Sequence, residues 1–299
     1  MLKNLLNKNI YQAIVRCGIT PESLFEVRLR IGKPLVICGK FGNAVVTENG
    51  VCYPSDRKKN TAQPVVAQAE DVEYALSVAS GHSVYAVSDS LLKGYISYRG
   101  MRIGASGAVV SEGGRVSALK NIASLNIRIP HEVKGCAGEV SYIVDGGLKN
   151  ILVVSPPGAG KTTLLRELTR LYSEKLYNIL LIDERNEIAA VSDGKSILDA
   201  GDFTDVMAGA EKKLVYENAV RSMRPDMIVM DELFGEDDAE GICDIARAGV
   251  RVMASVHARD TEALKNTPFE RMLRFFDFFL VLERPGGKIR VIENKGTKM

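Results

Sequence analysis

The sequence has few of the features that secreted and membrane-embedded proteins need. Its 299 residues include five cysteines, an odd number with no Cys-x-x-Cys pair, so neither a disulfide framework nor a zinc site is expected. No apolar run approaches the roughly 18 residues of a membrane span, and the start of the chain lacks the apolar stretch of a signal peptide. The nearest approach, 275–282, is interrupted by Asp277 and is interpreted as a buried strand. These absences predict a cytoplasmic protein in a reducing compartment.

The sequence also lacks tryptophan, and it has no large excess of charge of one sign. The 39 Lys and Arg residues nearly balance the 37 Asp and Glu residues, which leaves a formal net charge of +2. Proteins that coat nucleic acid normally carry a strongly basic face, and those that bind single strands stack bases on aromatic side chains. Because the chain has no Trp and no stripe of interleaved basic and aromatic residues, a nucleic-acid partner is disfavoured.

Length and a change of pattern predict two domains. In residues 1–134, leucines at helical spacing are followed by short strand-like segments, and Gly32-Lys-Pro34 turns the chain between two of them. This pattern predicts a smaller α+β N-terminal domain with a curved antiparallel sheet. In residues 135–299, short apolar blocks alternate with helical patterns, which is typical of a mostly parallel sheet covered on both faces. The predicted fold class is therefore α/β for 135–299, preceded by an α+β domain.

A small-residue loop joins the apolar stretch 151–154 to a helical pattern. It reads Ser155-Pro-Pro-Gly-Ala-Gly-Lys-Thr162, a Walker A pattern with Ser155 in place of the usual first glycine. Small residues allow backbone N–H groups to face a phosphate, and the helix N-terminus adds its positive end. We expect Lys161 to reach the β- and γ-phosphates and the Thr162 hydroxyl to bind Mg²⁺. The sequence thus predicts ATP and Mg²⁺ as ligands, held by Ser155, Pro156, Pro157, Gly158, Ala159, Gly160, Lys161, Thr162 and Thr163.

An acidic pair follows the apolar stretch 227–230. In open α/β sheets the carboxyl ends of the strands face the ligand. We therefore expect Asp231 to bind Mg²⁺ and Glu232 to act as the base or to position the attacking water. The glutamate favours hydrolysis of ATP over phosphoryl transfer to a small molecule.

Two more apolar stretches also end in polar residues. After 179–182, Glu184 and Glu187 are expected to contribute to the metal and water site, and Arg185 to contact a phosphate or a neighbour. After 252–256, His257 is placed where a sensor of the γ-phosphate would lie. For the acidic segment a solvated loop is the alternative, and for His257 a structural role.

Two arginines precede the 227–230 stretch. Arg221 and Arg224 are candidates for stabilising charge on the transferring phosphoryl group, which a neighbouring subunit often does in trans. Arginines on the surface of a helix are common, so a purely structural role is the alternative.

Four motifs now stand in order, at 155–162, 183–187, 227–232 and 254–257. This order resembles that of the type II/type IV secretion ATPase superfamily, the hexameric motors of pili and secretion systems. The chain is most similar to one branch, the stage III sporulation protein AA family of spore-forming Firmicutes. That resemblance spans nearly the whole chain and rests on Glu26-Val-Arg-Leu-Arg-Ile-Gly-Lys-Pro-Leu35, Lys93-Gly-Tyr-Ile96, 120–129, 132–136, 183–188 and 221–226. The sequence departs from the pattern at Ser155, at Leu233-Phe234, where a smaller Ile-Gly pair is typical, and in the acidic stretch 236–240.

The resemblance implies a RecA-like ATPase domain over 135–299 and a motor that energises the channel between mother cell and forespore. It implies a location at the cytoplasmic face of a membrane complex, membrane-protein partners and a ring-shaped hexamer. It also implies an N-terminal domain that lends an arginine to the nucleotide, for which Arg102 and Arg128 are candidates.

Two other functions stay open. One is a slow, nucleotide-gated assembly subunit whose role is scaffolding; Glu232 favours turnover instead. The other is a nucleic-acid-dependent ATPase of the RecA-like kind, which strong stimulation of ATP hydrolysis by single-stranded DNA would favour.

Overall fold

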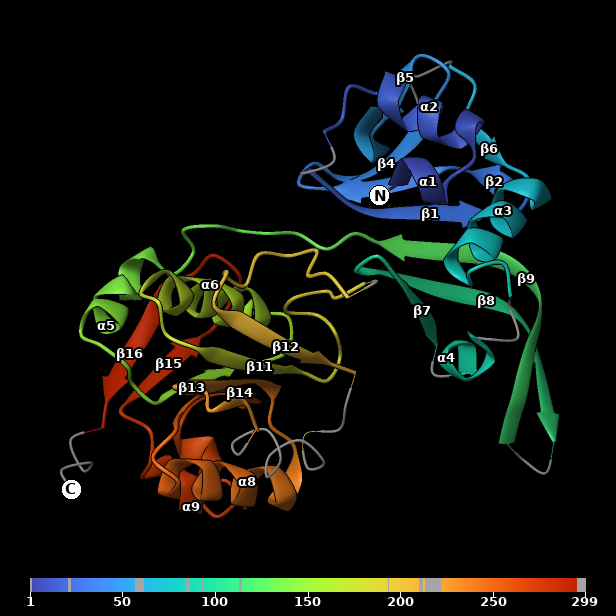
Figure 1. Ribbon diagram of the computed structural model, residues 1–299. Coiled ribbons are helices and arrows are strands. Elements are labelled where there is room, and N and C mark those ends of the chain that lie inside the picture. Colours follow the sequence, from blue (N-terminus) through green and yellow to red (C-terminus); the bar gives the residue numbers. More distant parts are fainter. Residues whose placement is uncertain are drawn as a thin grey trace. The chain divides into compact units, whose positions relative to one another are not determined.

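The chain divides into two compact units, Met1–His131 and Glu132–Met299, each of which is described by itself. The computed structural model describes residues 2–20, 23–56, 62–83, 87–92, 94–112, 115–192, 194–209, 212 and 222–294 (Figure 1). The domain boundary expected after residue 134 lies close to the division between the units and stays a prediction.

The first unit is built on a seven-stranded antiparallel sheet of order β5-β4-β3-β1-β9-β8-β7. Its strands are β1 (Leu24–Arg30), β3 (Val36–Gly39), β4 (Gly42–Thr47), β5 (Gly50–Cys52), β7 (Tyr95–Tyr98), β8 (Met101–Glu112) and β9 (Arg115–Arg128). The short strands β2 (Lys33–Pro34) and β6 (Val66–Ala67) pair separately. The helices are α1 (Leu2–Leu5), α2 (Lys8–Arg16), α3 (Ala69–Ala79) and α4 (Ser88–Leu92).

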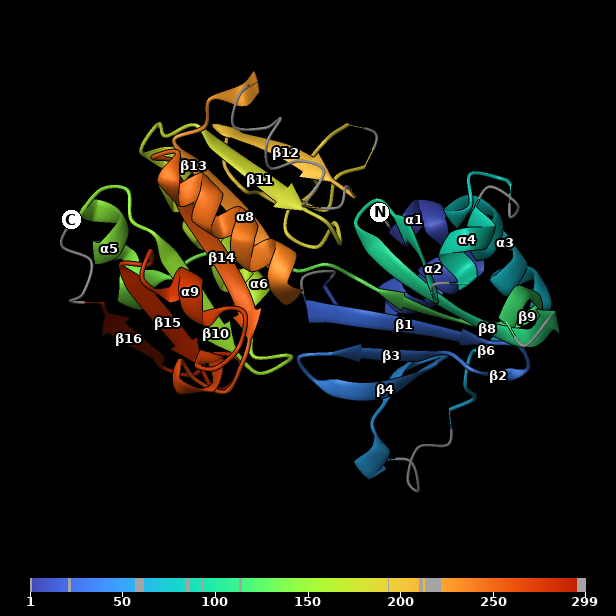
Figure 2. The ribbon, with the colours of Figure 1, turned by 90° about the horizontal axis from the view of Figure 1, so that it is seen from below.

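These four helices gather on one face of the sheet (Figure 2). Strand β1 shows why: Val27 and Leu29 are fully buried in the core, while Arg28 and Arg30 alternate with them on the opposite face. Side chains on a strand alternate between its two faces, so one apolar face requires a cover and the other does not.

The second unit contains a seven-stranded sheet of order β12-β11-β13-β14-β10-β15-β16, parallel except for the last pair. The strands are β10 (Ile151–Ser155), β11 (Ile179–Asp183), β12 (Thr204–Ala208), β13 (Met227–Glu232), β14 (Arg251–His257), β15 (Phe278–Leu282) and β16 (Ile289–Glu293). The helices are α5 (Ser141–Asp145), α6 (Lys161–Glu174), α8 (Gly235–Arg247) and α9 (Glu270–Leu273).

Both faces of this sheet are covered, which explains its continuous apolar strands. Along β10, Ile151 and Val153 pack into the core formed with α5 and α6, whereas Leu152 and Val154 pack into the core formed with α8 and α9. The parallel sheet and the antiparallel sheet confirm the predicted fold class. Among the described residues, no helix is long and apolar enough to cross a membrane.

Candidate nucleotide-binding site

Four neighbouring parallel strands end at the same edge of the second sheet. The order β11-β13-β14-β10 brings Asp183, Asp231, Glu232, His257 and Ser155 to that edge, and Ser155 lies opposite His257 in the strand register. Residues more than 100 positions apart thus meet because parallel strands align their carboxyl ends. This is the edge at which open α/β sheets bind ligands.

The loop between β10 and α6 has the backbone of a phosphate cradle. Gly158 and Gly160 have φ angles of 76° and 96°, in the left-handed region that a side chain makes costly. Gly160 is the N-cap of α6 and provides no side-chain cap, and the helical bonding begins with Leu164 N–H donating to the Gly160 carbonyl at 3.0 Å. The N–H groups of 161–163 precede that first bond, so the helix end is suited to an anion.

Ser155 fits where the pattern usually has glycine because its side chain is small and its hydroxyl is hydrogen-bonded. It is fully buried, and its hydroxyl donates to the Pro156 carbonyl at 2.9 Å. The Ala159 N–H closes the following turn onto the same carbonyl at 3.4 Å. The departure at Ser155 therefore leaves the loop geometry intact.

The cradle and the acidic pair of β13 are in direct contact. The Thr162 hydroxyl donates to Asp231 Oδ1 at 3.5 Å, and Lys161, which is only 9% exposed, places Nζ 3.8 Å from Glu232 Oε2. Within the described ranges no three His, Cys, Asp or Glu side chains cluster as a metal site. A hydroxyl and one carboxylate are a suitable protein contribution to Mg²⁺, which keeps several waters and takes phosphate oxygens from its nucleotide.

Asp231 lies in an environment that disfavours its negative charge. Burial, then the carboxylates of Glu187 and Asp183, raise the pKa of Asp231 to about 6, while the Lys161 ammonium acts in the opposite direction. A bound cation would relieve this repulsion, so the electrostatics fit a metal ion at Thr162 and Asp231.

Glu232 is surrounded by cationic and imidazole groups. Its Oε2 lies 3.1 Å from Arg185 Nη1 and 3.4 Å from His257 Nε2, in addition to the contact with Lys161, and its side chain is 14% exposed. His257 Nδ1 lies 3.3 Å from the Ser155 carbonyl. The histidine therefore bridges the phosphate-loop strand and the carboxylate.

Asp183 and Arg166 hold the acidic segment, roles that were not predicted. Asp183 accepts hydrogen bonds from the N–H groups of Glu187, Ile188 and Ala189 at 2.8 to 2.9 Å. Burial raises the pKa of Asp183 and these three bonds oppose that rise. Arg166 of α6 donates to the Glu187 carbonyl at 2.7 Å and to the Ile188 carbonyl. Helix α6 thereby fixes the segment that carries Glu187.

Asp183→Asn is expected to lower the free energy of unfolding by about 2 kcal/mol or more, because the new amide NH₂ would face backbone donors and leave N–H groups unpaired. Urea denaturation measures this change. The exposed Asp202→Asn is the control and should stay within about 0.5 kcal/mol of the original protein. Equal stability of both variants would contradict the bracing role of Asp183.

Glu184 forms an ion pair with a lysine. Its Oε2 pairs with Lys212 Nζ at 2.5 Å, and Lys212 also lies 3.3 Å from Asp238 of α8. Asp238 in turn accepts the Phe234 N–H at 2.7 Å. The predicted role of Glu184 in the metal and water site stays a prediction, and the structure shows a tie between the acidic segment and α8.

Four arginines were predicted to act at the nucleotide, and their roles are not tested by the structure. Arg221 lies outside the described residues, and Arg224 is exposed and has no contact with the site in the part of the chain that is described. Arg102 and Arg128 belong to the first unit, where Arg102 stacks on Tyr95 at 4.4 Å and Arg128 lies 3.9 Å from Glu26. Their roles at a nucleotide stay predictions.

Comparison with known proteins identifies the family. Residues 1–299 match the family model described as sporulation stage III, protein AA. The chain belongs to this sporulation stage III protein AA family. Stage III sporulation protein AA of Bacillus subtilis (strain 168) is 33% identical over 285 residues, covering 91% of this chain and 87% of the relative. The resemblance expected from the motifs is thereby confirmed.

Two solved structures share the fold of this family member. The ATPase DotB of Yersinia pseudotuberculosis has a TM-score of 0.54 at 14% identity, covering 92% of this chain and 76% of that one. The pilus retraction motor PilT with bound ADP has a TM-score of 0.53 at 18% identity, covering 96% and 83%. At these identities the likeness shows the fold alone, which this chain shares with the ATPase DotB and the motor PilT.

Proposed function

We propose that this sporulation stage III protein AA is a Mg²⁺-dependent ATPase motor that energises a membrane channel complex during sporulation. The observation that carries the proposal is the contact between the phosphate loop and the Asp231-Glu232 pair. The Thr162 hydroxyl lies 3.5 Å from Asp231 Oδ1, and Lys161 Nζ lies 3.8 Å from Glu232 Oε2. The likeness to the ATPase DotB and to the pilus retraction motor PilT with bound ADP supports it, as does the family's place in sporulation. We further propose that it acts as a ring at the cytoplasmic face of a membrane complex.

In the proposed mechanism each group has one task. The N–H groups at the start of α6 and the Lys161 ammonium bind the phosphates, while Thr162 and Asp231 hold the metal ion. Mg²⁺, when bound, neutralises charge that develops on the phosphate oxygens. Glu232 orients the attacking water and accepts its proton, and His257 holds the Glu232 carboxylate in place at 3.4 Å.

The ionised Asp231 carboxylate is expected to bind the metal ion but to lower the free energy of unfolding when no metal is bound. The variant Asp231→Asn tests both expectations. An acid whose pKa is raised by folding costs stability once ionised, so the cost grows from pH 4 to about 6 and is complete above. At pH 7.5 the variant should be more stable than the original, by up to about 3 kcal/mol, without ligand. It should also lose the extra stability that Mg·ATP gives. Thermal denaturation with and without Mg·ATP measures both effects.

Asp244→Asn, at a mostly exposed carboxylate of α8, is the matched control and should shift neither quantity. A ligand-free Asp231→Asn protein that melts below the original would contradict the electrostatic cost. An unchanged response to Mg·ATP would contradict the metal role.

A scaffolding subunit remains the second candidate because Glu232 is paired with three groups, Lys161, Arg185 and His257. Turnover separates the two candidates: the motor requires an ATPase rate well above that of a variant without the Glu232 carboxylate.

A further inference from the structure

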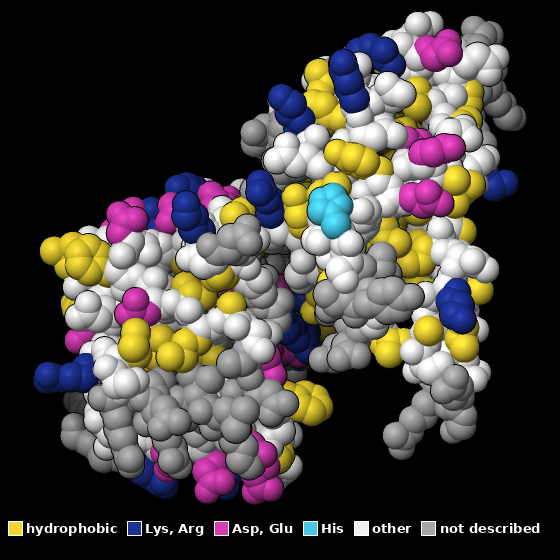
Figure 3. Space-filling model, turned by 45° about the vertical axis from the view of Figure 1, so that its right-hand side comes forward, with side chains coloured by type: hydrophobic (Ala, Val, Ile, Leu, Met, Phe, Trp, Pro, Cys, Tyr) yellow, Lys and Arg dark blue, Asp and Glu magenta, His cyan; other side chains and the backbone are white. Residues whose placement is uncertain are grey.

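Arg185 is a charged residue of the nucleotide site that has no task in the mechanism proposed above. It lies in the acidic segment that follows β11, its side chain is 54% exposed, and its Nη1 lies 3.1 Å from Glu232 Oε2. On the face of the second unit seen in Figure 3, Lys and Arg side chains lie close to Asp and Glu side chains. An exposed arginine beside a carboxylate is therefore common, and it needs no function of its own.

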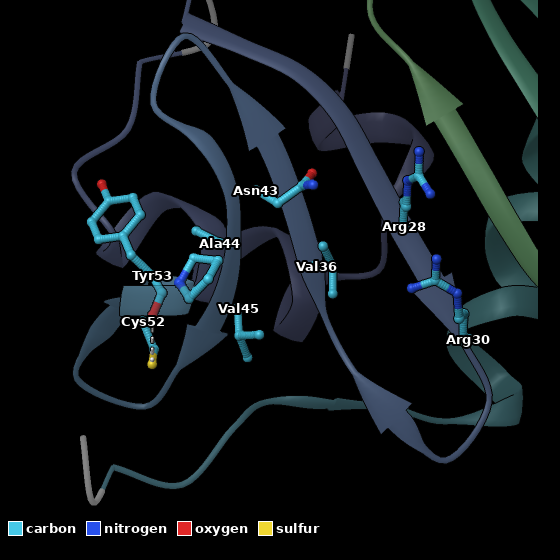
Figure 4. A pocket seen from close by; sticks show the side chains of 9 residues that line it. Arg28, Arg30, Val36, Asn43, Ala44, Val45, Cys52 and Tyr53 are labelled. Atoms are coloured by element: carbon cyan, nitrogen blue, oxygen red, sulfur yellow. Dashed lines mark hydrogen bonds between the residues drawn. The ribbon is translucent and has the colours of Figure 1, made fainter. Parts of the chain in front are cut away.

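An arginine pair of the first unit is an example of such a structural contact. Arg28 lies 2.7 Å from Glu26, two residues away on β1, and Figure 4 shows it with Arg30 beside a pocket of about 270 Å³. Arg128, which lies opposite Glu26 on β9, approaches the same glutamate at 3.9 Å. Glu26 thereby ties two neighbouring strands together, which accounts for the contact without a ligand.

At Glu232 the second cation comes from the phosphate loop instead. Lys161 Nζ lies 3.8 Å from Oε2, the same oxygen that Arg185 approaches at 3.1 Å. Because both distances end on one atom, the two nitrogens are at most about 7 Å apart. A phosphate has oxygens roughly 2.5 Å apart, so with bonds of about 2.8 Å it can accept from two cations up to about 8 Å apart. A phosphate bound by Lys161 is therefore within reach of Arg185.

The backbone on both sides of Arg185 is held by hydrogen bonds. Asp183 accepts the three N–H groups of 187–189. The Asn186 side chain accepts the Val191 N–H at 2.6 Å and donates to the Val191 carbonyl at 2.8 Å. An exposed side chain changes rotamer rapidly, so the guanidinium can exchange one acceptor for another while this backbone stays in place.

We propose that Arg185 is a catalytic arginine that binds the γ-phosphate of ATP in the same chain and makes the site select ATP over ADP. The γ-phosphate competes with the Glu232 carboxylate for Lys161 and Arg185. ADP has no third phosphate, so it leaves Arg185 on Glu232. The inference rests on the proposed function, because it assigns a further residue to the proposed reaction.

The same exchange of partners prepares Glu232 for its task. Once both cations bind the phosphate, Glu232 retains its contact with His257 and its carboxylate is available to water. Water then attacks the γ-phosphorus, the bond between that phosphorus and ADP breaks, and Glu232 takes the proton of the water. Arg185 donates to the γ-phosphate oxygens during this step and stabilises their negative charge.

Binding measured without turnover tests the phosphate contact. In the Glu232→Gln background, Arg185→Ala can no longer act through the carboxylate at position 232. The ratio of the Kd for Mg·ADP to the Kd for Mg·ATP, measured by calorimetry, should fall at least about 10-fold when Arg185→Ala is added, the size of one hydrogen bond to a charged group. The affinity for Mg·ADP should stay within about two-fold.

The matched control for this measurement is Arg247→Ala in the same background. Arg247 is 61% exposed and pairs with Asp244 at 3.0 Å, so the substitution removes an exposed arginine from one carboxylate on α8. The ratio of the two dissociation constants should then stay unchanged. Thermal denaturation checks that all variants fold.

Turnover tests the catalytic part of the proposal in chains that keep Glu232. At saturating Mg·ATP, Arg185→Ala should lower kcat at least about 10²-fold, the scale of one lost donor to developing charge. Arg185→Lys keeps the positive charge but not the planar fork of donors. It should therefore recover part of the preference for ATP and little of kcat.

Three results would overturn the proposal. One is a preference for ATP that Arg185→Ala leaves unchanged in the Glu232→Gln background. Another is a kcat of Arg185→Ala that equals or exceeds the original, which would mean that Arg185 only holds Glu232. The third is a mixture of Arg185→Ala and Lys161→Ala chains that is more active than either alone, which would mean that the arginine serves a neighbouring copy.

Failure of the proposed function gives a different result. An original protein that binds Mg·ATP but does not hydrolyse it would contradict the ATPase and the catalytic role of Arg185. The fall in the ratio of dissociation constants would still show that Arg185 binds the γ-phosphate. An original protein that binds no nucleotide would contradict both proposals.

Discussion

Lys161→Ala is expected to weaken ATP binding by at least about 30-fold while leaving the protein folded. Lys161 is 9% exposed and begins α6, so its ammonium is a fixed cation beside the N–H groups that would hold the phosphates. Removing one partner of a buried charge pair costs about 2–5 kcal/mol, which corresponds to a Kd at least about 30-fold higher. Isothermal titration calorimetry with Mg·ATP measures the loss.

The ligand-free variant should remain folded because Glu232 keeps Arg185 at 3.1 Å and His257 at 3.4 Å. Lys175→Ala is the matched control: it removes a lysine from the other end of α6, where it pairs with Asp145 on the surface. That variant should bind ATP like the original. Normal ATP binding by Lys161→Ala would mean that the loop is not the phosphate cradle.

The parts of the site that lie at strand ends could be predicted from the sequence. Apolar blocks define parallel strands, parallel strands align their carboxyl ends, and so Ser155, Asp231 and His257 had to share one edge if the strands were neighbours. The fold class followed from the same periodicity.

The contacts that brace the site could not be predicted, because they depend on the direction of side chains in a loop. Glu184 and Glu187 are three residues apart in one acidic stretch, yet Glu184 pairs with Lys212 while the Glu187 backbone is held by Asp183 and Arg166. In the sequence Arg166 is one more polar residue of a helix. Only the packing of α6 against the 183–189 segment gives it a function.

In the first unit, alternation predicted strands but not which polar residues would share an open face. Arg28 lies opposite Asn126 and Arg30 opposite Ser124 only through the register of β1 with β9. Register is set by pairing across 90 or more residues, which a single strand's pattern does not contain.

Glu232→Gln is expected to retain ATP binding and to lower the turnover rate by about 10²-fold or more, the scale of a lost general base. The amide keeps the size of the carboxylate but cannot accept a proton from water. It also ends the ion pairs of Glu232 with Arg185 and Lys161. Since Lys161 is then no longer attracted to position 232, nucleotide affinity should stay equal or increase.

Phosphate release under saturating Mg·ATP, combined with calorimetry, separates the two effects in Glu232→Gln. The control is Glu262→Gln, which makes the same substitution at a glutamate that is 73% exposed. This variant should hydrolyse ATP at the original rate. A rate in Glu232→Gln equal to that of the original protein would remove the argument for a motor. Because binding would then persist without carboxylate-dependent turnover, such a result would favour a nucleotide-gated scaffold. A loss of binding together with turnover would instead mean that Glu232 holds the nucleotide pocket open rather than positioning water.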